Sequence, residues 1–309
     1  MERKGSKASP VAHALRLAGA QHGAIRSDQA RAVGLTKDQL ARMVRDGLLR
    51  RRRRGLYVAT TVPSDHRQDA MLAVLAAPPD AVTSHETALF LHGLGPAPSQ
   101  VHLTVHPDVR LRLDNVVAHR SPLPPTHRAM VGRLPVTTLH RTLVDLASVT
   151  DLDGLAAVLD PLVTDGRVHP ARLLSTIDDI VLAPGRHGTA LLRAALQVWT
   201  GQIRPGSPAE ARLLRLLRER GYAGYQTQVQ VEVDGRMRFI DVGWPERLVG
   251  LEYAGRLPHG PRRWPSDEGR ADELERAGWS LREVDASALL PGQTALWDWL
   301  DRRLRSRAA

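Results

Sequence analysis

The sequence contains no cysteine among its 309 residues. This absence excludes a disulfide scaffold, a thiolate metal site and a cysteine nucleophile. A chain without cysteine suits a reducing compartment. The redox chemistry of the sequence is therefore consistent with the cytoplasm.

Long apolar runs are also missing, since no stretch approaches the roughly 20 apolar residues that a membrane helix needs. The first residues, MERKGSKASP, are basic, as they are in a signal peptide. The segment after them, however, carries His13, Arg16 and His22 where the apolar core of a signal peptide would lie. We therefore expect a cytoplasmic protein that has no membrane partner.

Lysine is rare, and nearly all of the positive charge comes from arginine. The chain has 43 Lys and Arg against 33 Asp and Glu, a net charge of +10 and an isoelectric point near 10.9. Such an excess favours a polyanionic partner such as nucleic acid. A hydrophobic content of 42% is typical of a globular protein, and the length predicts two or three compact units.

The order of predicted helices and strands indicates a multidomain α/β protein. We divide it into a winged helix-turn-helix domain over residues 10–62, an α+β domain over 63–150, a helical connector over 151–200 and a sheet domain over 201–309. The stretch GQIRPGSP at 201–208 is rich in Gly and Pro, which is typical of a linker.

A helix-turn-helix is predicted in the first domain. Ser27 can cap a short helix ending at Val33, and Gly34 can supply the turn. Thr36 and Gln39 then form a capping box, in which each side chain accepts a hydrogen bond from the other residue's main chain. The second helix spans residues 37–46 and stops at a glycine suited to the left-handed position.

Basic residues on the second helix and after it are the candidates for DNA contact. Leu40, Met43 and Val44 form a buried stripe, and the other side of the helix carries Lys37, Arg42 and Arg45, as expected for a helix in the major groove. A run of five arginines then leads into the strand of residues 55–59 and predicts a basic wing that neutralises phosphates: Arg50, Arg51, Arg52, Arg53 and Arg54. The alternative is a solvated basic turn.

The N-terminal half resembles the AbiEi family of antitoxins. Residues 22–60 are similar to the winged helix of that family, and the phrases AVTSHETALFLHGL, VHLTVHP, VVAHRSPLP and LPVTTLHRTLVDLAS extend the likeness across residues 10–150. The resemblance implies a double-stranded DNA partner, repression of the protein's own operon and a possible toxin partner. It implies no catalysis.

Histidines in this half invite a metal or acid–base interpretation. His85 with Glu86, and His140 with Arg141, are interpreted as helix-terminal, and His85 lies near the start of a predicted helix. The spacing typical of a zinc site is missing. We interpret these residues as polar groups that support the fold.

Two acidic residues carry the chemistry predicted for the C-terminal domain. If residues 245–248 connect two antiparallel strands, Trp244 faces Val249, and Asp241 lies opposite Glu252. Opposed residues share a sheet face with β-carbons about 4.5–5.5 Å apart. Two carboxylates at that separation can hold a divalent cation such as Mg²⁺, which activates water and stabilises a phosphodiester transition state.

This layout resembles the restriction-endonuclease-like PD-(D/E)XK group, in particular its branch related to the Vsr mismatch endonuclease. The phrases SPAEARLLRLL, FIDVGWPERLVGLEYAG and DEGRADELERAGWSLREV carry the likeness. The resemblance implies catalytic roles for Glu210, Asp241, Glu252 and His259, and metal ligation by Asp241 and Glu252. Capping of the first helix is the alternative role of Glu210.

The sequence departs from this group at Ala254, where a lysine or an aspartate is usual. A positioned acid or base contributes roughly 10²–10⁴-fold in rate, so we expect a nuclease-derived and degenerate domain. The leading hypothesis is a DNA-binding regulator of antitoxin or defence type. The alternatives are an active Mg²⁺-dependent endonuclease and an antitoxin that acts by binding a toxin protein.

Overall fold

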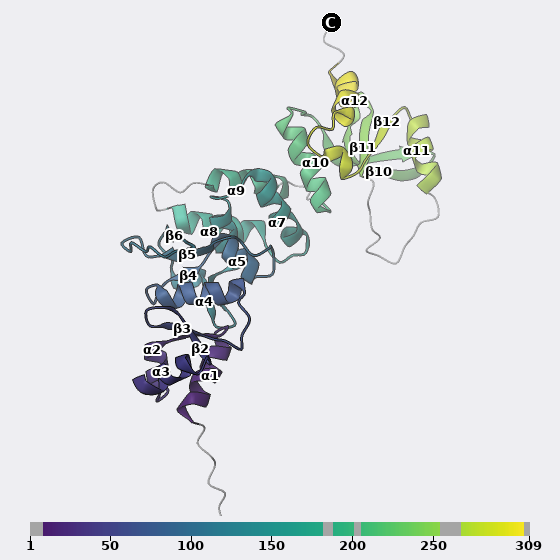
Figure 1. Cartoon of the computed structure of the whole chain (residues 1–309). Helices are drawn as coiled ribbons and strands as arrows, with labels where there is room; N and C mark the ends of the chain where they lie inside the picture. Colours follow the sequence, from purple (N-terminus) through teal and green to yellow (C-terminus); the bar gives the residue numbers. More distant parts are fainter. Residues whose placement is uncertain (1–8, 182–187, 201–204, 254–266, 306–309) are drawn as a thin grey trace, which may run out of the picture. The chain divides into compact units, whose positions relative to one another are not determined.

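The computed structural model describes residues 9–181, 188–200, 205–253 and 267–305 (Figure 1). Helices and three separate sheets confirm the predicted multidomain α/β class. The chain forms two compact units, one of residues 1–159 and 168–193, the other of residues 160–167 and 194–309. The four domains predicted from the sequence stay a prediction. In the described ranges, no helix is both long and apolar enough to cross a membrane.

The first unit begins with the N-terminal module, by which we mean residues 10–62. Its elements are α1 (Pro10–Ala20), β1 (Ala24–Arg26), α2 (Ser27–Ala32), α3 (Lys37–Arg45), β2 (Leu49–Arg53) and β3 (Leu56–Ala59). The strands form an antiparallel sheet in the order β1-β3-β2. The core holds Ala18, Ile25, Leu40, Met43 and Leu49. Three helices and the hairpin thus surround one small core.

A five-stranded mixed sheet follows in the same unit. Its elements are α4 (His66–Ala76), β4 (Val82–Thr83), α5 (His85–Leu91), β5 (Val101–Val105), β6 (Val116–Arg120), η1 (Pro125–His127), β7 (Arg128–Val131) and β8 (Leu134–Thr137). The strand order is β6-β5-β4-β8-β7, with β5–β6 and β4–β8 parallel. Met71 of α4 and Leu91 of α5 share the core with Leu103 and Val136 of the sheet.

Four helices complete the first unit and lead into the second: α6 (Leu139–Leu146), α7 (Leu152–Thr164), α8 (Pro170–Val181) and α9 (Thr189–Leu196). Arg141 of α6 is fully buried and holds together parts that are distant in sequence. Its guanidinium donates to Asp145 Oδ1 at 2.8 Å, to Ser121 Oγ at 2.9 Å and to the Pro122 carbonyl at 3.1 Å. These contacts confirm that Arg141 supports the fold.

The second unit contains a four-stranded sheet in the order β12-β11-β10-β9. Its elements are η2 (Gln197–Trp199), α10 (Pro208–Glu219), β9 (Gln226–Val233), β10 (Arg236–Trp244), η3 (Pro245–Arg247), β11 (Val249–Tyr253), α11 (Asp267–Arg276), β12 (Ser280–Val284), η4 (Ser287–Leu289) and α12 (Ala295–Leu304). Asp234 and Gly235 both have positive φ and form the two-residue hairpin turn between β9 and β10. β11 and β12 run parallel, and α11 lies between them in the chain.

Two separate cores cover the two faces of this sheet. α10 and α12 pack on one face, where Trp297 and Trp299 are buried together with strand residues such as Val242 and Leu251. α11 packs on the other, through Leu274 against strand residues such as Ile240. The sheet is thus the middle layer of three, and the two tryptophans are packing residues.

The buried Arg141 network gives a stability prediction for the first unit. Replacing Arg141 with methionine leaves the Asp145 carboxylate buried without its cation, which costs about 3–5 kcal/mol. All six tryptophans belong to the second unit. Urea unfolding followed by far-ultraviolet circular dichroism should therefore show an earlier transition, while the tryptophan fluorescence transition stays in place. Exposed Arg133→Met is the control, and equal midpoints for the two variants would contradict the role of Arg141.

Candidate nucleic-acid interface

Helix α3 is fixed at its start by the capping box that the sequence predicted. The Thr36 main-chain N–H donates to Gln39 Oε1 at 2.9 Å, and the Gln39 N–H donates to Thr36 Oγ1 at 3.2 Å. Gly47 follows the helix with a φ of +73°, as expected for a left-handed stop. The prediction that Ser27 caps α2 was wrong. The helix begins at Ser27 and its cap is Arg26, because the Arg26 N–H donates to Gln29 Oε1 at 3.0 Å.

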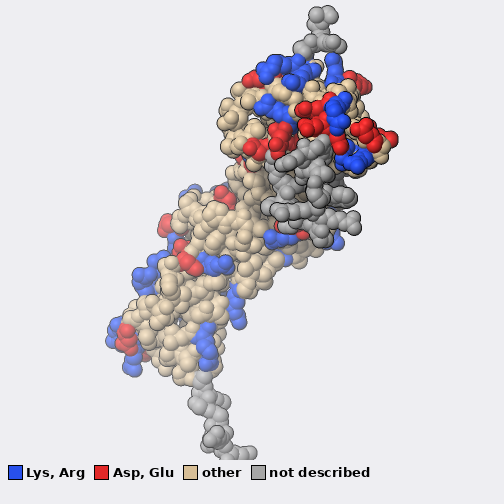
Figure 2. Space-filling view, turned by 90° about the vertical axis from the view of Figure 1, so that its right-hand side faces the viewer, with Lys and Arg blue, Asp and Glu red and all other residues tan. Residues whose placement is uncertain are grey.

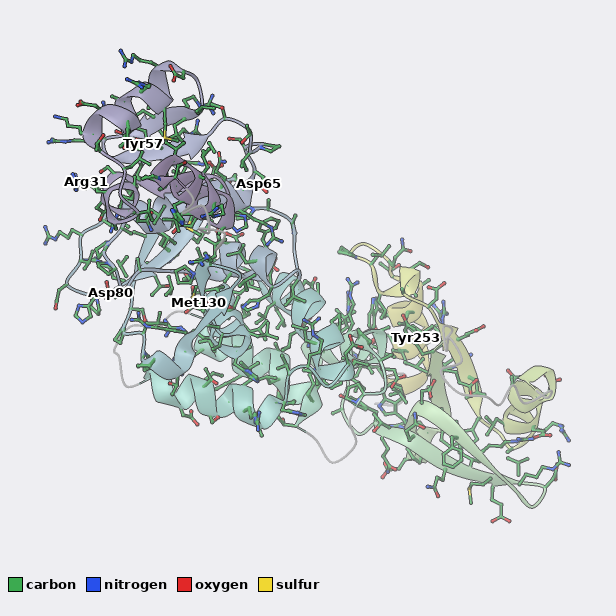
Figure 3. All side chains as sticks on the ribbon, turned by 90° about the horizontal axis from the view of Figure 1, so that it is seen from below. Arg31, Tyr57, Asp65, Asp80, Met130 and Tyr253 are labelled. Atoms are coloured by element: carbon green, nitrogen blue, oxygen red, sulfur yellow. The ribbon has the colours of Figure 1, made fainter. Side chains whose placement is uncertain are left out.

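The outer side of α3 is basic. Leu40 and Met43 are buried, whereas the three predicted contact residues are all exposed: Lys37, Arg42 and Arg45. Arg31 of α2 is a further exposed cation that the sequence analysis did not single out, and Figure 3 labels it on the N-terminal module. The first helix of a helix-turn-helix crosses the DNA backbone. The position of Arg31 on the helix before the glycine turn was therefore the signal that could have identified it.

The five arginines lie on the first strand of a hairpin and in its turn. β2 pairs with β3 from Leu49–Ala59 to Arg53–Leu56, with an irregularity between Arg51 and Arg53. Leu49 alone in β2 is buried, and the run from Arg50 to Arg54 is exposed. Gly55 completes the turn with a φ of +75°. The hairpin therefore presents the arginine side chains to solvent next to α3 in the same module.

Two of these arginines are partly neutralised by acidic residues of the same unit. Arg53 pairs with Asp114 at 2.9 Å, and Arg52 lies 3.7 Å from Asp69. No sequence pattern predicts either contact, because both acids lie outside the N-terminal module. The remaining three arginines are the better candidates for phosphate contact: Arg50, Arg51 and Arg54.

Positive charge is concentrated in the N-terminal module. Residues 10–62 contain eleven Lys and Arg against three Asp and Glu, so their net charge is +8, out of +10 for the whole chain. Figure 2 shows one face of the molecule, on which acidic side chains gather mainly over the second unit. The distribution supports a polyanion-binding surface in the module and not a general basicity of the chain.

The C-terminal strands pair in the register that the sequence predicted. Trp244 lies opposite Val249 and Val242 opposite Leu251. The next pair in this register is Asp241 with Glu252, where the regular ladder has ended. Both residues are half-buried. The predicted register holds because four residues, 245–248, connect the two strands.

The Asp241 carboxylate is used in hydrogen bonds within the sheet. Oδ2 accepts from the Tyr253 main-chain N–H at 2.9 Å, and Oδ1 accepts from Gln228 Nε2 at 3.1 Å. Ile240 and Val242 pack into the cores of opposite faces although they are two residues apart. β10 therefore rotates at Asp241. Where β10 and β11 separate, the Asp241 carboxylate takes the place of a main-chain carbonyl as the acceptor for the Tyr253 N–H. This gives an acidic residue inside a strand a structural role.

Neighbouring residues of β11 face opposite sides of the sheet, which separates Tyr253 from Glu252. Tyr253 packs on the α10 and α12 face, so alternation directs Glu252 to the face of α11. Glu210, at the start of α10, accepts from the Gly206 N–H at 2.8 Å and from Ser207 Oγ at 3.3 Å, while Ser207 itself caps the helix. Burial and the charge of Asp285, followed by that of Glu210, raise the pKa of the Tyr253 phenol. The charge of Glu210 therefore acts on this phenol.

Two of the predicted acids have hydrogen-bond partners within the protein. Asp241 accepts from two donors, and Glu210 accepts from the Gly206 N–H and from Ser207 Oγ. Among the residues that the structure describes, no group of three or more metal-ligating side chains includes Asp241 or Glu252. His259 and Ala254 lie outside the described residues. Metal ligation by Asp241 and Glu252, and catalysis by the four predicted residues, stay predictions.

Comparison with known proteins bears on the N-terminal module. Residues 14–60 match the model of a family described as "Transcriptional regulator, AbiEi antitoxin". The chain is also similar to the crystal structure of the RV2827C protein from Mycobacterium tuberculosis, at 18% identity over 62% of this chain and 71% of that chain, with a TM-score of 0.33. No curated protein matches. The AbiEi likeness is thus confirmed for residues 14–60, while the Vsr-like likeness stays a prediction.

The charge distribution of the hairpin predicts how binding depends on salt. Replacing Arg50 and Arg51 with alanine should weaken binding to every duplex, because each lost phosphate contact lowers the slope of log affinity against log salt by about 0.9. Fluorescence anisotropy at several salt concentrations measures this slope. Arg236→Ala with Arg247→Ala is the control, since it removes two exposed arginines from the second unit. An unchanged slope in the hairpin variant would show that the arginines do not contact phosphates.

Proposed function

We propose that this protein is a DNA-binding transcriptional regulator of antitoxin type, which holds double-stranded DNA through an N-terminal winged helix-turn-helix. The observation that carries the proposal is the coincidence, within one module of net charge +8, of a basic helix and an arginine hairpin. The match of residues 14–60 to the AbiEi regulator family supports it independently.

The two basic elements are suited to different parts of the duplex. α3 is nine residues long, is capped at its start and directs Lys37, Arg42 and Arg45 away from the core, so we place it in the major groove. The β2–β3 hairpin then serves as the wing, with arginines on phosphates or in a narrow minor groove. In this arrangement α3 supplies sequence preference and the wing supplies general affinity.

Substitutions in α3 test whether this helix supplies the sequence preference and the wing supplies the general affinity. Replacing Arg42 or Arg45 with alanine should cost about 1–3 kcal/mol on a preferred site if the contact to guanine is bidentate. Binding to unrelated duplexes should fall much less. Competition assays against the DNA upstream of the protein's own gene and against scrambled duplex measure both affinities. A uniform loss on all sequences would reduce these residues to backbone contacts and leave the reading of bases unexplained.

For the second unit we propose a nuclease-derived fold that works without cleavage. The order α10-β9-β10-β11-α11-β12 and the register of β10 with β11 agree with the layout expected of the PD-(D/E)XK group. The hydrogen bonds of Asp241, those of Glu210 and the alanine at position 254 support a structural reuse of the acidic positions. An Mg²⁺-dependent endonuclease is the alternative that the register favours. Binding of a toxin protein is a further alternative implied by the antitoxin likeness.

An Asp241 variant separates the structural role from the catalytic one. Asp241→Ala removes both acceptors and should destabilise the second unit by about 1.5–3 kcal/mol, the usual contribution of hydrogen bonds to a charged group. DNA affinity should not change, and the native protein should not nick supercoiled or mismatched DNA with Mg²⁺ or Mn²⁺. Tryptophan-detected urea unfolding, anisotropy and plasmid nicking give the three readouts. Metal-dependent nicking that is lost in Asp241→Asn would establish the endonuclease instead.

A further inference from the structure

Three histidines from separate segments meet in the first unit. His85 begins α5, His102 lies on β5 and His119 lies on the neighbouring parallel strand β6. One ring nitrogen of each lies within 4.8 Å of the others. The rings of His85 and His119 are stacked with centroids 3.5 Å apart, and Nδ1 of His102 is 3.0 Å from Nε2 of His119. The strand pairing and the start of α5 thus bring three imidazoles to one place.

A carboxylate fixes the orientation of the central ring. Glu86 Oε2 lies 2.9 Å from Nε2 of His102. When this nitrogen carries the proton, Nδ1 of His102 has a lone pair directed toward His119. A carboxylate that accepts a hydrogen bond from one ring nitrogen fixes the tautomer of an imidazole whose other nitrogen binds a metal, and raises its basicity. The pair of Glu86 and His102 therefore has the form of an outer-shell carboxylate and its ligand.

Two of the three rings are buried. His85 and His102 are 4% and 9% exposed, and His119 is half-buried. The side chain of Glu86, which contacts His102, is 46% exposed. The cluster therefore lies below the surface with one partly exposed carboxylate beside it.

The spacing of the nitrogen atoms is close to that of a zinc site. Two ligands at 2.0–2.1 Å in tetrahedral geometry lie about 3.3 Å apart, against 3.0 Å between His102 and His119. Without a metal, one hydrogen atom between these two nitrogens satisfies both. With a metal, that hydrogen leaves and the stacked rings of His85 and His119 turn their lone pairs toward one point. The pairing of β5 with β6 sets the distance between His102 and His119, and the ring of His85 has to rotate out of its stack on His119 to complete the site.

We propose that His85, His102 and His119 bind a first-row transition metal ion of the Zn²⁺ class, with Glu86 holding His102 in place. Three imidazoles leave a fourth position for water or for an incoming ligand. No local pattern in the sequence predicts this site, because its ligands come from three elements and lack the spacing of a zinc motif. Only the pairing of β5 with β6 and the position of α5 bring them together.

Metal binding by the full-length protein, with any affinity tag removed, tests the proposal. After treatment with a chelator, titration with ZnCl₂ should show one tight site per chain, and CoCl₂ should give the intense visible bands of tetrahedral Co²⁺. His119→Gln should lose the tight site. Glu86→Gln should bind Zn²⁺ about 10–100-fold more weakly, as expected for loss of an outer-shell partner.

His106→Gln is the matched control, because His106 is an exposed histidine outside the cluster and pairs with Asp108. It should bind like the native chain. If circular dichroism shows that His119→Gln is unfolded, the Co²⁺ spectrum of the native chain and the affinity of Glu86→Gln decide. The proposal is overturned if the native chain has no tight site, if its Co²⁺ spectrum is octahedral, or if folded His119→Gln binds as the native chain does.

Discussion

Antiparallel pairing of β2 with β3 is the constraint on which the proposed interface depends. Five consecutive arginines repel one another, and on a free segment they would stay disordered. Here Leu49 at one end and the buried residues of β3 anchor the strand to the core that also receives Leu40 and Met43 of α3. The small hydrophobic core therefore holds two positively charged elements side by side. A DNA duplex that neutralises both basic elements relieves the repulsion between their positive charges, which the fold otherwise has to overcome.

Local signals in the sequence predicted the N-terminal module well. The capping box, the glycine stop and the spacing of apolar residues each act within a few residues, and the structure confirms them at Thr36, Gln39 and Gly47. β4, β7 and β8 were not predicted, because such short strands have little periodicity of their own. Their place in the sheet is set by pairing with partners that are distant in sequence.

Candidate sites were harder to predict, since chemistry depends on faces and contacts across the fold. The register of β10 with β11 followed from a connection length, yet the rotation of the strand at Asp241 did not. That rotation directs the carboxylate to the Tyr253 main chain, and Figure 3 labels this tyrosine in the second unit. The histidine cluster is the opposite case. Ordinary strand pairing brings together residues whose spacing in the sequence predicts no site.

Hydrogen–deuterium exchange with and without DNA tests the central claim most directly. The full-length protein is compared alone and bound to the duplex upstream of its own gene, and protection is mapped by mass spectrometry. The account predicts that peptides covering α3 and the β2–β3 hairpin, residues 37–59, gain protection that disappears at high salt. Protection confined to the second unit, with residues 37–59 unchanged, would contradict the account.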